Sequence, residues 1–349
     1  MFKVNNIKIG KKYPPFIIAE MSANHNQSIT NALKIVREAA KCGVNAIKLQ
    51  TYTPDTITIR SKRKEFKINS SKSLWKGKDL YSLYKEAYTP WEWHKQIFDE
   101  AKKNNIICFS SPFDETSVDF LEKINTPMYK VASSECVDIH LIKTIAQTKK
   151  PMIISTGMAT KKEIYEAIEC AKKYGCQNIA LLKCTSTYPA PLNDINLKTI
   201  EHMRKEFNCE VGLSDHTLGI GVPLVAICNG ATIIEKHFTL SRKIKSADSE
   251  FSSEPNEFKQ LVIESKKIKS SIGKVKYGPT NSEKNSTIFR RSLYVVKNIK
   301  KDTIFTKDNI KSIRPALGLK TSNLERIIGK KSKKNIKKGT PLKWNMIKL

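Results

Sequence analysis

The stretch ATIIEKHF, residues 231–238, is an apolar, β-prone run that ends in charged side chains and in His237. The stretch EVGLSDHT, residues 210–217, has the same design, with His216 behind its apolar part. Short apolar runs of this length are typical of buried strands. The two histidines are either two well-paired structural side chains or two ligands of one metal ion. The remainder of the sequence bears on this choice.

Six further runs of the same kind precede these two, and segments with helical periodicity separate them. For example, Ile164, Ala167, Ile168 and Ala171 recur at the spacing of one helix face. Eight strands, each followed by a helix, predict an α/β fold of the (β/α)8 TIM-barrel class. A doubly wound sheet is the alternative. The expected strands are 16–20, 46–52, 106–112, 128–133, 151–157, 178–185, 210–215 and 232–238.

Composition along the chain predicts two domains. The barrel domain is expected to span residues 1–273, and residues 274–289 to form a linker, since they are rich in Gly, Pro, Ser and Asn without periodicity. Residues 290–349 then form a small domain with an internal repeat. NIKKDTIFTKDNI (298–310) returns there as NIKKGTPLKWNMI (335–347). Each copy is predicted to form a strand, a turn and a strand, which indicates a β-rich domain with pseudo-symmetry.

The segment from Thr51 to Pro90 is long and carries no clear helix before LYSLYKEA, residues 80–87. Loops of this length inside a compact domain are usually functional or mobile. We expect this segment to cover an active site.

The chain has 349 residues, of which 62 are Lys or Arg and 33 are Asp or Glu, so its net charge is +29. The lysines are spread over nearly every expected helix, and aromatic residues do not alternate with them as a nucleic-acid stacking platform would require. We therefore expect solvated lysine-rich faces and no nucleic-acid partner. A basic nucleic-acid-binding protein is the distant alternative.

The eight cysteines stand singly within expected helices and strands, and none forms a CxxC pair. This pattern is typical of reduced thiols in a cytoplasmic protein rather than of a disulfide framework. The start, MFKVNNIKIG, lacks the apolar segment of a secretory signal. No run approaches the ~20 apolar residues of a membrane span. We expect a cytoplasmic protein without a membrane partner.

Every expected strand ends in polar side chains, and in a TIM barrel these ends form the active site. A purely structural barrel has no need for eight polar strand ends. Because a buried lysine is costly unless it is paired, Lys48 and Lys130 predict a bound anion. Nearby hydroxyl groups suit phosphate oxygens. The strand-end groups are Glu20; Lys48 and Gln50; Ser110 and Ser111; Lys130, Ser133 and Glu135; Ser155 and Thr156; Lys183, Thr185 and Ser186; Ser214, Asp215 and His216; Glu235 and His237.

His216 and His237 stand on neighbouring expected strands, so they are well placed to bind one divalent metal. Glu20, on the strand that closes the barrel beside the last one, is a candidate third ligand or base. Glu135 either caps the helix that follows it or binds substrate. These patterns predict a metal-assisted barrel enzyme for a phosphate-bearing substrate, and they do not name the reaction.

Several long motifs in one order resemble the sialic acid synthase family over essentially the whole chain. The tail, from RRSLYV (290–295) through IRPALGL (313–319) to LKWNM (342–346), looks like the antifreeze-like SAF domain of that family. The motifs of the barrel are AEMSANHNQS (19–28), IKLQTYTPDT (47–56), YKVASSE (129–135), IISTGM (153–158), CTSTYPAP (184–191), GLSDHT (212–217) and EKHFT (235–239).

The resemblance implies a condensation of phosphoenolpyruvate with the aldehyde of an N-acetylated amino sugar, which gives a nine-carbon keto acid and phosphate. It implies a divalent metal on His216 and His237, typically manganese, with magnesium and cobalt as alternatives. Glu20 would handle the water or stabilise a cation. The implied substrate contacts are Lys48, Lys130, Ser133, Ser155 and Ser214 with help from Ser111 and Ser186 for phosphoenolpyruvate, Gln50, Tyr188 and Asp248 for the sugar, and Glu135.

ANHNQS, LQTYTPDTIT and AYTPWEWH are similar to the subgroup whose acceptor is 2,4-diacetamido-2,4,6-trideoxy-altrose. Synthases that make neuraminic or legionaminic acid from another N-acetylated hexose are the alternative. Neuraminic acid synthases commonly have Thr at Ser111 and Asn at Ser186, which puts the contacts of these two residues in doubt. In the family the SAF domain reaches the active site of the other subunit. The resemblance therefore implies a homodimer, with Arg314 directed to the sugar.

Overall fold

The computed structural model describes residues 2–69 and 73–348. The chain divides into two compact units, Met1–Gly273 and Lys274–Leu349. Within the described residues, no helix is both long enough and apolar enough to cross a membrane.

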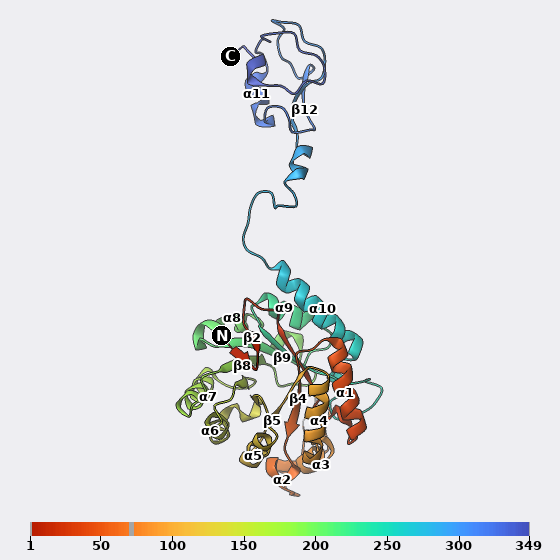
Figure 1. Cartoon of the computed structure of the whole chain (residues 1–349), viewed down its shortest axis with the longest axis vertical. Helices are drawn as coiled ribbons and strands as arrows, with labels where there is room; N and C mark the ends of the chain where they lie inside the picture. The colour runs from red at the N-terminus through yellow and green to blue at the C-terminus, as the bar shows by residue number, and fades with distance from the viewer. Residues whose placement is uncertain (1, 70–72, 349) are drawn as a thin grey trace. The chain divides into compact units, whose positions relative to one another are not determined.

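The first unit is a closed barrel of eight parallel strands, and Figure 1 shows the helices packed around it. The last strand pairs with the first, and His237 lies opposite Glu20 in that register. This closure confirms the predicted TIM barrel and excludes the open doubly wound sheet. The strands are β3 (Phe16–Glu20), β4 (Ala46–Thr51), β5 (Ile107–Pro112), β6 (Tyr129–Val131), β7 (Met152–Ser155), β8 (Ile179–Cys184), β9 (Glu210–Asp215) and β10 (Ile233–His237).

Helices follow the strands, and local signals in the sequence define their ends. Ser28 accepts a hydrogen bond from the Asn31 amide at the start of α1, and Gly43 ends this helix with a positive φ of 83°. Thr160 and Glu163 form a capping box at the start of α7. The helices of this unit are α1 (Ile29–Cys42), α2 (Pro54–Ile57), α3 (Leu80–Ala87), α4 (Trp91–Lys103), α5 (Glu115–Lys123), α6 (Ile139–Gln147), α7 (Lys161–Lys173), α8 (Lys198–Phe207), α9 (Gly221–Cys228) and α10 (Pro255–Ser271).

The barrel unit has two separate apolar cores. One lies between the strands and the helices. The other fills the amino-terminal half of the barrel interior. A hairpin of β1 (Phe2–Val4) and β2 (Ile7–Ile9) contributes Phe2, Val4 and Ile9 to the inner core and so closes that end of the barrel. The other inner residues include Phe16, Ile18, Ala46, Phe109, Met128, Ile153, Leu182 and Ile233.

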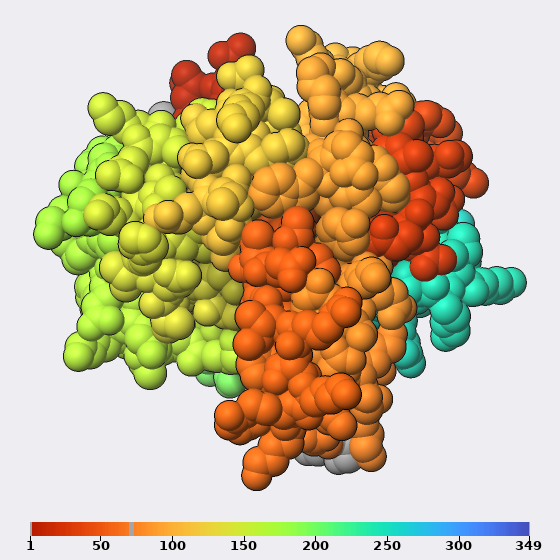
Figure 2. All heavy atoms as spheres, turned by 90° about the horizontal axis from the view of Figure 1, so that it is seen from below, coloured from red at the N-terminus to blue at the C-terminus, as the bar shows by residue number. Residues whose placement is uncertain are grey.

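The connection after β4 holds two short helices that the sequence did not indicate, α2 and the 3-10 turn η2 (Lys64–Phe66), before α3. Figure 2 shows this connection in orange, spread over the middle and the lower part of the face that it views. The indole of Trp75, within this connection, donates a hydrogen bond to the Ala247 carbonyl at 2.9 Å. The connection is thereby tied to the loop that follows β10.

The second unit has its own apolar core and little regular structure. It holds η6 (Asn285–Phe289), which lies inside the segment expected to be a linker, β11 (Ser292–Val295), β12 (Ile310–Ile313), η7 (Thr321–Asn323), α11 (Leu324–Ile327) and η8 (Trp344–Met346). Each copy of the repeat was expected to hold two strands, but the described part of this unit holds only β11 and β12. The two copies meet through an isolated bridge between Ile299 and Ile336 instead of through paired strands.

The predicted pseudo-symmetry of the repeat is clear in the hydrogen bonds. Ile299 and Ile336 are equivalent residues, and each amide donates to the carbonyl of the other at 2.8 Å. The side chain of Asn335 accepts from the Lys301 amide, and that of its equivalent, Asn298, accepts from the Lys338 amide, both at 2.8 Å. The two copies therefore pair about a local two-fold axis.

Candidate active site

Strand alternation decides which polar side chains enter the barrel. On β10, Ile233 belongs to the inner core, so Glu235 and His237, two and four residues further on, point to the same interior. Lys236 points the other way, and its ammonium donates to Asp215 Oδ2 at 2.6 Å. Lys236 and Asp215 thus form a buried ion pair behind the strands, outside the candidate site.

Glu20, Lys48, Lys130 and Glu235 form a buried charge cluster at the carboxyl ends of the strands. The ammonium of Lys48 contacts a carboxylate oxygen of Glu20. Glu235 Oε1 lies 4.0 Å from Lys48 Nζ and 3.9 Å from Lys130 Nζ, and it accepts a hydrogen bond from Ser214 at 3.1 Å. All four charged side chains are at most 5% exposed. Because charges this deep require partners, the cluster is held in one arrangement.

The pKa values within this cluster diverge. Burial raises the pKa of Glu20 to about 7, although Lys48 pulls it down. Burial acts in the same direction on Glu235, but Lys130 and Lys48 outweigh it and lower the pKa of Glu235. Burial lowers the pKa of Lys130. One carboxyl can therefore carry a proton near neutral pH while its neighbour stays ionised, which is the arrangement that acid–base chemistry requires.

His216 and His237 converge above the charge cluster, with ring centroids 5.4 Å apart. His216 Nδ1 donates to the Thr185 carbonyl at 3.0 Å, which leaves Nε2 available. His237 Nδ1 is buried without a hydrogen-bond partner, and it lies 3.7 Å from Asp248 Oδ2. Burial and the neighbouring His216 hold the pKa of His237 well below its usual range, which favours the neutral imidazole that a metal ligand requires. Burial also acts to lower the pKa of His216, but the contact with Cys184 outweighs it and raises that pKa.

These residues fit a divalent metal ion. In the described part of the chain, no group of three His, Cys, Asp or Glu side chains forms a complete metal cluster. Two histidines would therefore leave the remaining coordination positions to water or substrate. Several buried polar atoms near these strand ends lack a hydrogen-bond partner. They include His237 Nδ1, Glu235 Oε2, Glu135 Oε2 and Ser155 Oγ.

The predicted serines lie near the same strand ends. Ser111 Oγ accepts from Lys48 Nζ at 3.3 Å. Ser133 Oγ accepts from the Gly157 amide at 3.2 Å. A Cβ added to Gly157 would lie 2.2 Å from Ser186 Oγ and 2.7 Å from Ser133 Oγ, so only glycine allows the two hydroxyl groups to converge there. Ser155 is buried on β7, and its Oγ has no partner.

Aromatic rings cover the histidine pair. The ring of Tyr188 lies 4.3 Å from that of His216 and 6.3 Å from that of His237, measured between centroids. Trp75 lies 5.6 Å from Tyr188 on the outer side of the stack, and Phe251 lies 4.9 Å from His237. Since Trp75 comes from the connection after β4, the contacts support the expectation that this connection covers the site.

Glu135 and Gln50 complete the predicted set within the barrel unit. Glu135 lies in the 3-10 turn η3 (Ser134–Val137) after β6, and burial raises its pKa to about 7. It caps no helix, because Asp138 supplies the side chain that accepts from the Leu141 amide at the start of α6. Gln50 lies opposite Ser111 in the pairing of β4 with β5. Arg314 belongs to the second unit, on the exposed segment directly after β12.

Two residues of this site were not among the predicted site residues. Glu235 was noticed as a strand-end group, and the alternation that directs His237 inward would have directed Glu235 inward too. Cys184 Sγ lies 3.9 Å from His216 Nδ1. Burial raises the pKa of this thiol, but the contact with His216 outweighs burial and lowers the pKa to about 6. A single cysteine in an apolar strand gave no sequence signal for this contact.

Comparison with known proteins supports the resemblance to the sialic acid synthase family. The NeuB family model matches residues 35–277, and the SAF domain model matches residues 290–348. The chain is 44% identical to the pseudaminic acid synthase of Campylobacter jejuni, over 98% of both chains. It is 42% identical to the pseudaminic acid synthase of Helicobacter pylori, over 94% of this chain and 96% of that protein.

More distant relatives share the architecture. The N,N'-diacetyllegionaminic acid synthase of Campylobacter jejuni is 36% identical over 92% of this chain and 96% of its own. The solved structure of the N-acetylneuraminic acid (sialic acid) synthetase of Leptospira borgpetersenii, in complex with citrate, superposes with a TM-score of 0.72 at 34% identity. That match covers 81% of this chain and 94% of the other. The resemblance to sialic acid synthases is confirmed, and the chain belongs to the NeuB family.

Proposed function

We propose that this chain is a pseudaminic acid synthase. It would condense phosphoenolpyruvate with 2,4-diacetamido-2,4,6-trideoxy-β-L-altropyranose and release pseudaminic acid and phosphate. The observation that carries the choice of sugar is the identity of 42% to 44% with pseudaminic acid synthases over nearly the whole chain. Identity with legionaminic acid synthases is lower, at 34% to 36%. The acceptor sugar of those synthases is therefore the second candidate.

The charge cluster supports a role in holding phosphoenolpyruvate. Lys48 and Lys130 supply two buried ammonium groups against the single low-pKa carboxylate of Glu235. Because the pKa of Glu20 is about 7, this carboxyl only partly offsets the two ammonium groups near neutral pH, and a bound anion can balance the remaining positive charge. Hydroxyl groups near the cluster then donate to phosphate and carboxylate oxygens. We assign this role to Ser111, Ser133, Ser155, Ser186 and Ser214.

The proposed chemistry joins carbon 3 of phosphoenolpyruvate to the aldehyde carbon of the sugar. Water then adds to carbon 2, and phosphate leaves with cleavage of its C–O bond. Glu20, whose pKa is about 7, takes the proton of that water or stabilises the cation that the water attacks. Glu135 has a similar pKa and would donate a hydrogen bond to the sugar, which Gln50, Tyr188 and Asp248 also contact.

We assign the metal site to His216 and His237, with manganese as the expected ion and magnesium or cobalt as alternatives. When bound, a divalent ion would act as a Lewis acid on the sugar aldehyde. The Thr185 carbonyl fixes the ring of His216 through Nδ1 and keeps Nε2 directed away from it.

The test measures inorganic phosphate released by metal-stripped protein with phosphoenolpyruvate, with and without manganese. The acceptors are the altrose sugar, its 2,4-diacetamido mannose analogue and N-acetylmannosamine. Manganese-dependent release with the altrose sugar alone is the expected result. Release with another acceptor would move the assignment to the legionaminic or neuraminic acid synthases. The lack of release with all three would contradict the synthase assignment.

The proposal includes a homodimer in which the SAF domain of one subunit completes the site of the other through Arg314. Its support is the exposed position of Arg314 on a segment that matches the SAF domain. Arg314→Ala is expected to keep the fold and the dimer and to raise KM for the sugar. Unchanged sugar kinetics would contradict this role. We also propose that the protein works in the cytoplasm, since all eight cysteines are free thiols.

A further inference from the structure

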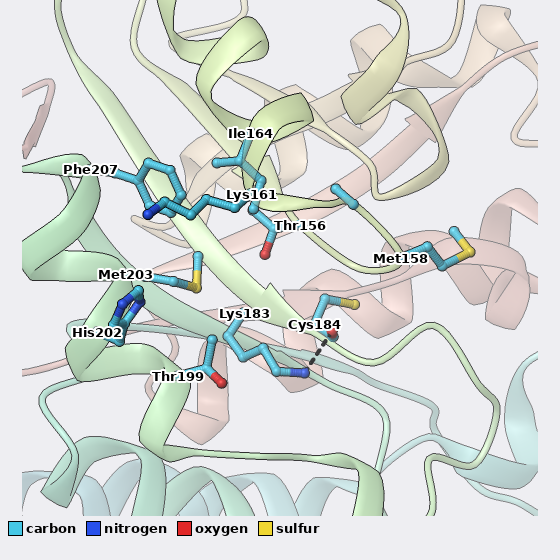
Figure 3. Close-up of a pocket in the computed structure, with 11 residues that line it drawn as sticks. Thr156, Met158, Lys161, Ile164, Lys183, Cys184, Thr199, His202, Met203 and Phe207 are labelled. Atoms are coloured by element: carbon cyan, nitrogen blue, oxygen red, sulfur yellow. Dashed lines mark hydrogen bonds between the residues drawn. The ribbon is translucent and has the colours of Figure 1, made fainter.

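A cavity of about 360 Å³ lies behind β8, outside the barrel wall, and Cys184 is shared between its lining and the candidate active site. On β8, Ala180 and Leu182 face the barrel interior, so Lys183 faces outward, toward α7 and α8. Figure 3 shows the Lys183 side chain in this cavity, between Thr199 and Cys184. Its volume is within the range of small-molecule pockets.

Lys183 is an unusual residue for this place. The outward faces of barrel strands normally pack apolar side chains against the helices. The Lys183 ammonium has three N–H groups, and two donate to neutral acceptors, the Cys184 carbonyl and the Thr185 hydroxyl, both at 2.9 Å. No carboxylate lies within 4.0 Å of this ammonium among the described residues. The half-buried ammonium therefore keeps one donor free and has no carboxylate in direct contact, while the more distant Asp194 still acts on its charge.

The rest of the cavity has one cationic side and one apolar side. Lys161 and His202 line it, and both contact the carboxylate of Glu206, at 2.6 Å and 3.7 Å. The Glu206 carboxylate therefore contacts both basic side chains at the rim. Among the described residues, no carboxylate lies within 4.0 Å of the Lys183 ammonium. The apolar lining comes from Met158, Ala159, Ile164, Met203 and Phe207.

Met158 adds to the apolar character at the edge of the cavity. It is 71% exposed. A ligand with a negative head and an apolar body matches this lining, since the head would meet Lys183 and the body would cover Met158 and Phe207. Neither inorganic ions nor fully polar molecules would use the apolar side.

The cavity is linked to the active site by two hydrogen bonds through one residue. Lys183 Nζ donates to Thr185 Oγ1 at 2.9 Å, and the carbonyl of the same Thr185 accepts from His216 Nδ1 at 3.0 Å. An anion that draws the Lys183 ammonium toward the cavity weakens the first bond and leaves the Thr185 hydroxyl with its other partner, the Asp194 carbonyl at 3.2 Å. The orientation of the His216 ring depends on the second bond, so a change at Lys183 reaches the barrel interior.

We propose that this cavity binds a small organic anion, a carboxylate or phosphate monoester on an apolar body, through Lys183, and that its occupancy shifts the His216 ring through Thr185. The site would make the enzyme responsive to a metabolite of this class. The proposal does not depend on the sugar or the metal assigned above, because both of its readouts are measured without turnover.

The test measures binding of three matched probes to the full chain by calorimetry: phenylacetate, phenyl phosphate and the neutral phenylacetamide. Lys183→Met keeps the length of the side chain and removes the charge. Lys162→Met is the matched control, because Lys162 is an exposed lysine of α7 that pairs only with Glu166. At least one anion should bind the parent chain and the control equally, and Lys183→Met and the neutral probe should each weaken binding at least tenfold.

The choice between the two anions identifies the head group. Equal binding of the anions by Lys183→Met would overturn the proposal, since the probes would then occupy another site. Ala159→Leu, which fills the cavity and keeps Lys183, is a second variant that should also abolish binding and that does not depend on the folding of Lys183→Met. Full binding by this variant would likewise count against the cavity.

The link to the active site has its own readout. The imidazole Hε1 resonance of His216, assigned by its loss in His216→Gln, should move when the bound anion is added to the parent chain. It should stay in place in Lys183→Met. A resonance that does not move while the anion is bound would overturn the link through Thr185.

Discussion

The two halves of the barrel interior are built on the same strands and differ in almost every chemical respect. On the amino-terminal side the inward residues are apolar, such as Ile18, Ala46 and Phe109. Two residues further along the same strands, roughly 7 Å away, they are Glu20, Lys48 and Ser111. The inner core of the first half is made of apolar side chains, whereas the other half holds the four buried charges of the cluster. Stability and chemistry are thus separated along each strand.

This contrast predicts that substitutions in the charged half reduce catalysis far more than they change folding. Lys130→Met should lower kcat/KM for phosphoenolpyruvate by roughly 10³-fold, because the charge that balances the anionic groups of this substrate is lost. Phosphate release measures this effect. Lys162→Met, on the surface of α7, is the matched control and should leave the rate unchanged. A loss of less than tenfold in Lys130→Met would mean that this lysine serves the fold.

The reverse pattern is expected in the apolar half. Phe109→Ala should lower the free energy of unfolding by about 4 kcal/mol, since Phe109 is fully buried and its removal leaves a cavity. Urea unfolding measures the loss, and kcat per folded molecule should stay the same. A large fall in kcat with little loss of stability would show that the two halves are not separable.

The charged half should also give stability its pH dependence. Burial raises the pKa of Glu135 from 4.5 to about 7, so the folded protein favours the protonated carboxyl. The stability contributed by that proton is complete below pH 4.5 and is lost as the pH rises through 7. The loss is about 3 kcal/mol at 1.4 kcal/mol per pKa unit. Glu135→Gln should remove this part of the slope in unfolding curves between pH 4.5 and 8, and an unchanged slope would contradict the burial of Glu135.

The smallest change in stability is expected at a polar residue of the catalytic end that caps a helix and does not contact substrate. The Asp114 carboxylate accepts from the Thr116 and Ser117 amides at the start of α5. Asp114→Ala should cost about 1 kcal/mol of stability and leave kcat unchanged. Thermal unfolding together with phosphate release measures both. A fall in kcat without a fall in stability would place Asp114 in the active site.

Much of the fold was predictable because its signals are local. The apolar runs FIIAE and TIIEKHF, helix stripes such as that of Ile164 and Ala167, and the cap at Ser28 all act over a few residues. The short helix α2 was missed, since four residues carry too weak a periodicity. The β content of the tail was overestimated, because the two copies of the repeat pair through one isolated bridge, between Ile299 and Ile336, rather than through strands.

The residue types of the candidate site were also predictable, since each strand end could be found in the sequence. Strand alternation alone separates Glu235 and His237 from Lys236, which is a local rule. No local rule brings Cys184 to within 3.9 Å of His216 or gives Lys183 its cavity between α7 and α8. Those placements depend on helices and strands that are far apart in the sequence.

The sequence by itself determined that eight polar strand ends would meet in a barrel, because hydrophobic periodicity fixes which elements form and which face is buried. Only the tertiary structure decided how the charges are shared. Closure of β10 onto β3 sets Glu235 about 4 Å from both Lys48 and Lys130, and this distance together with burial lowers one carboxyl pKa and raises the other. Electrostatic energies depend on separation and solvent exclusion, and both arise only when the barrel closes.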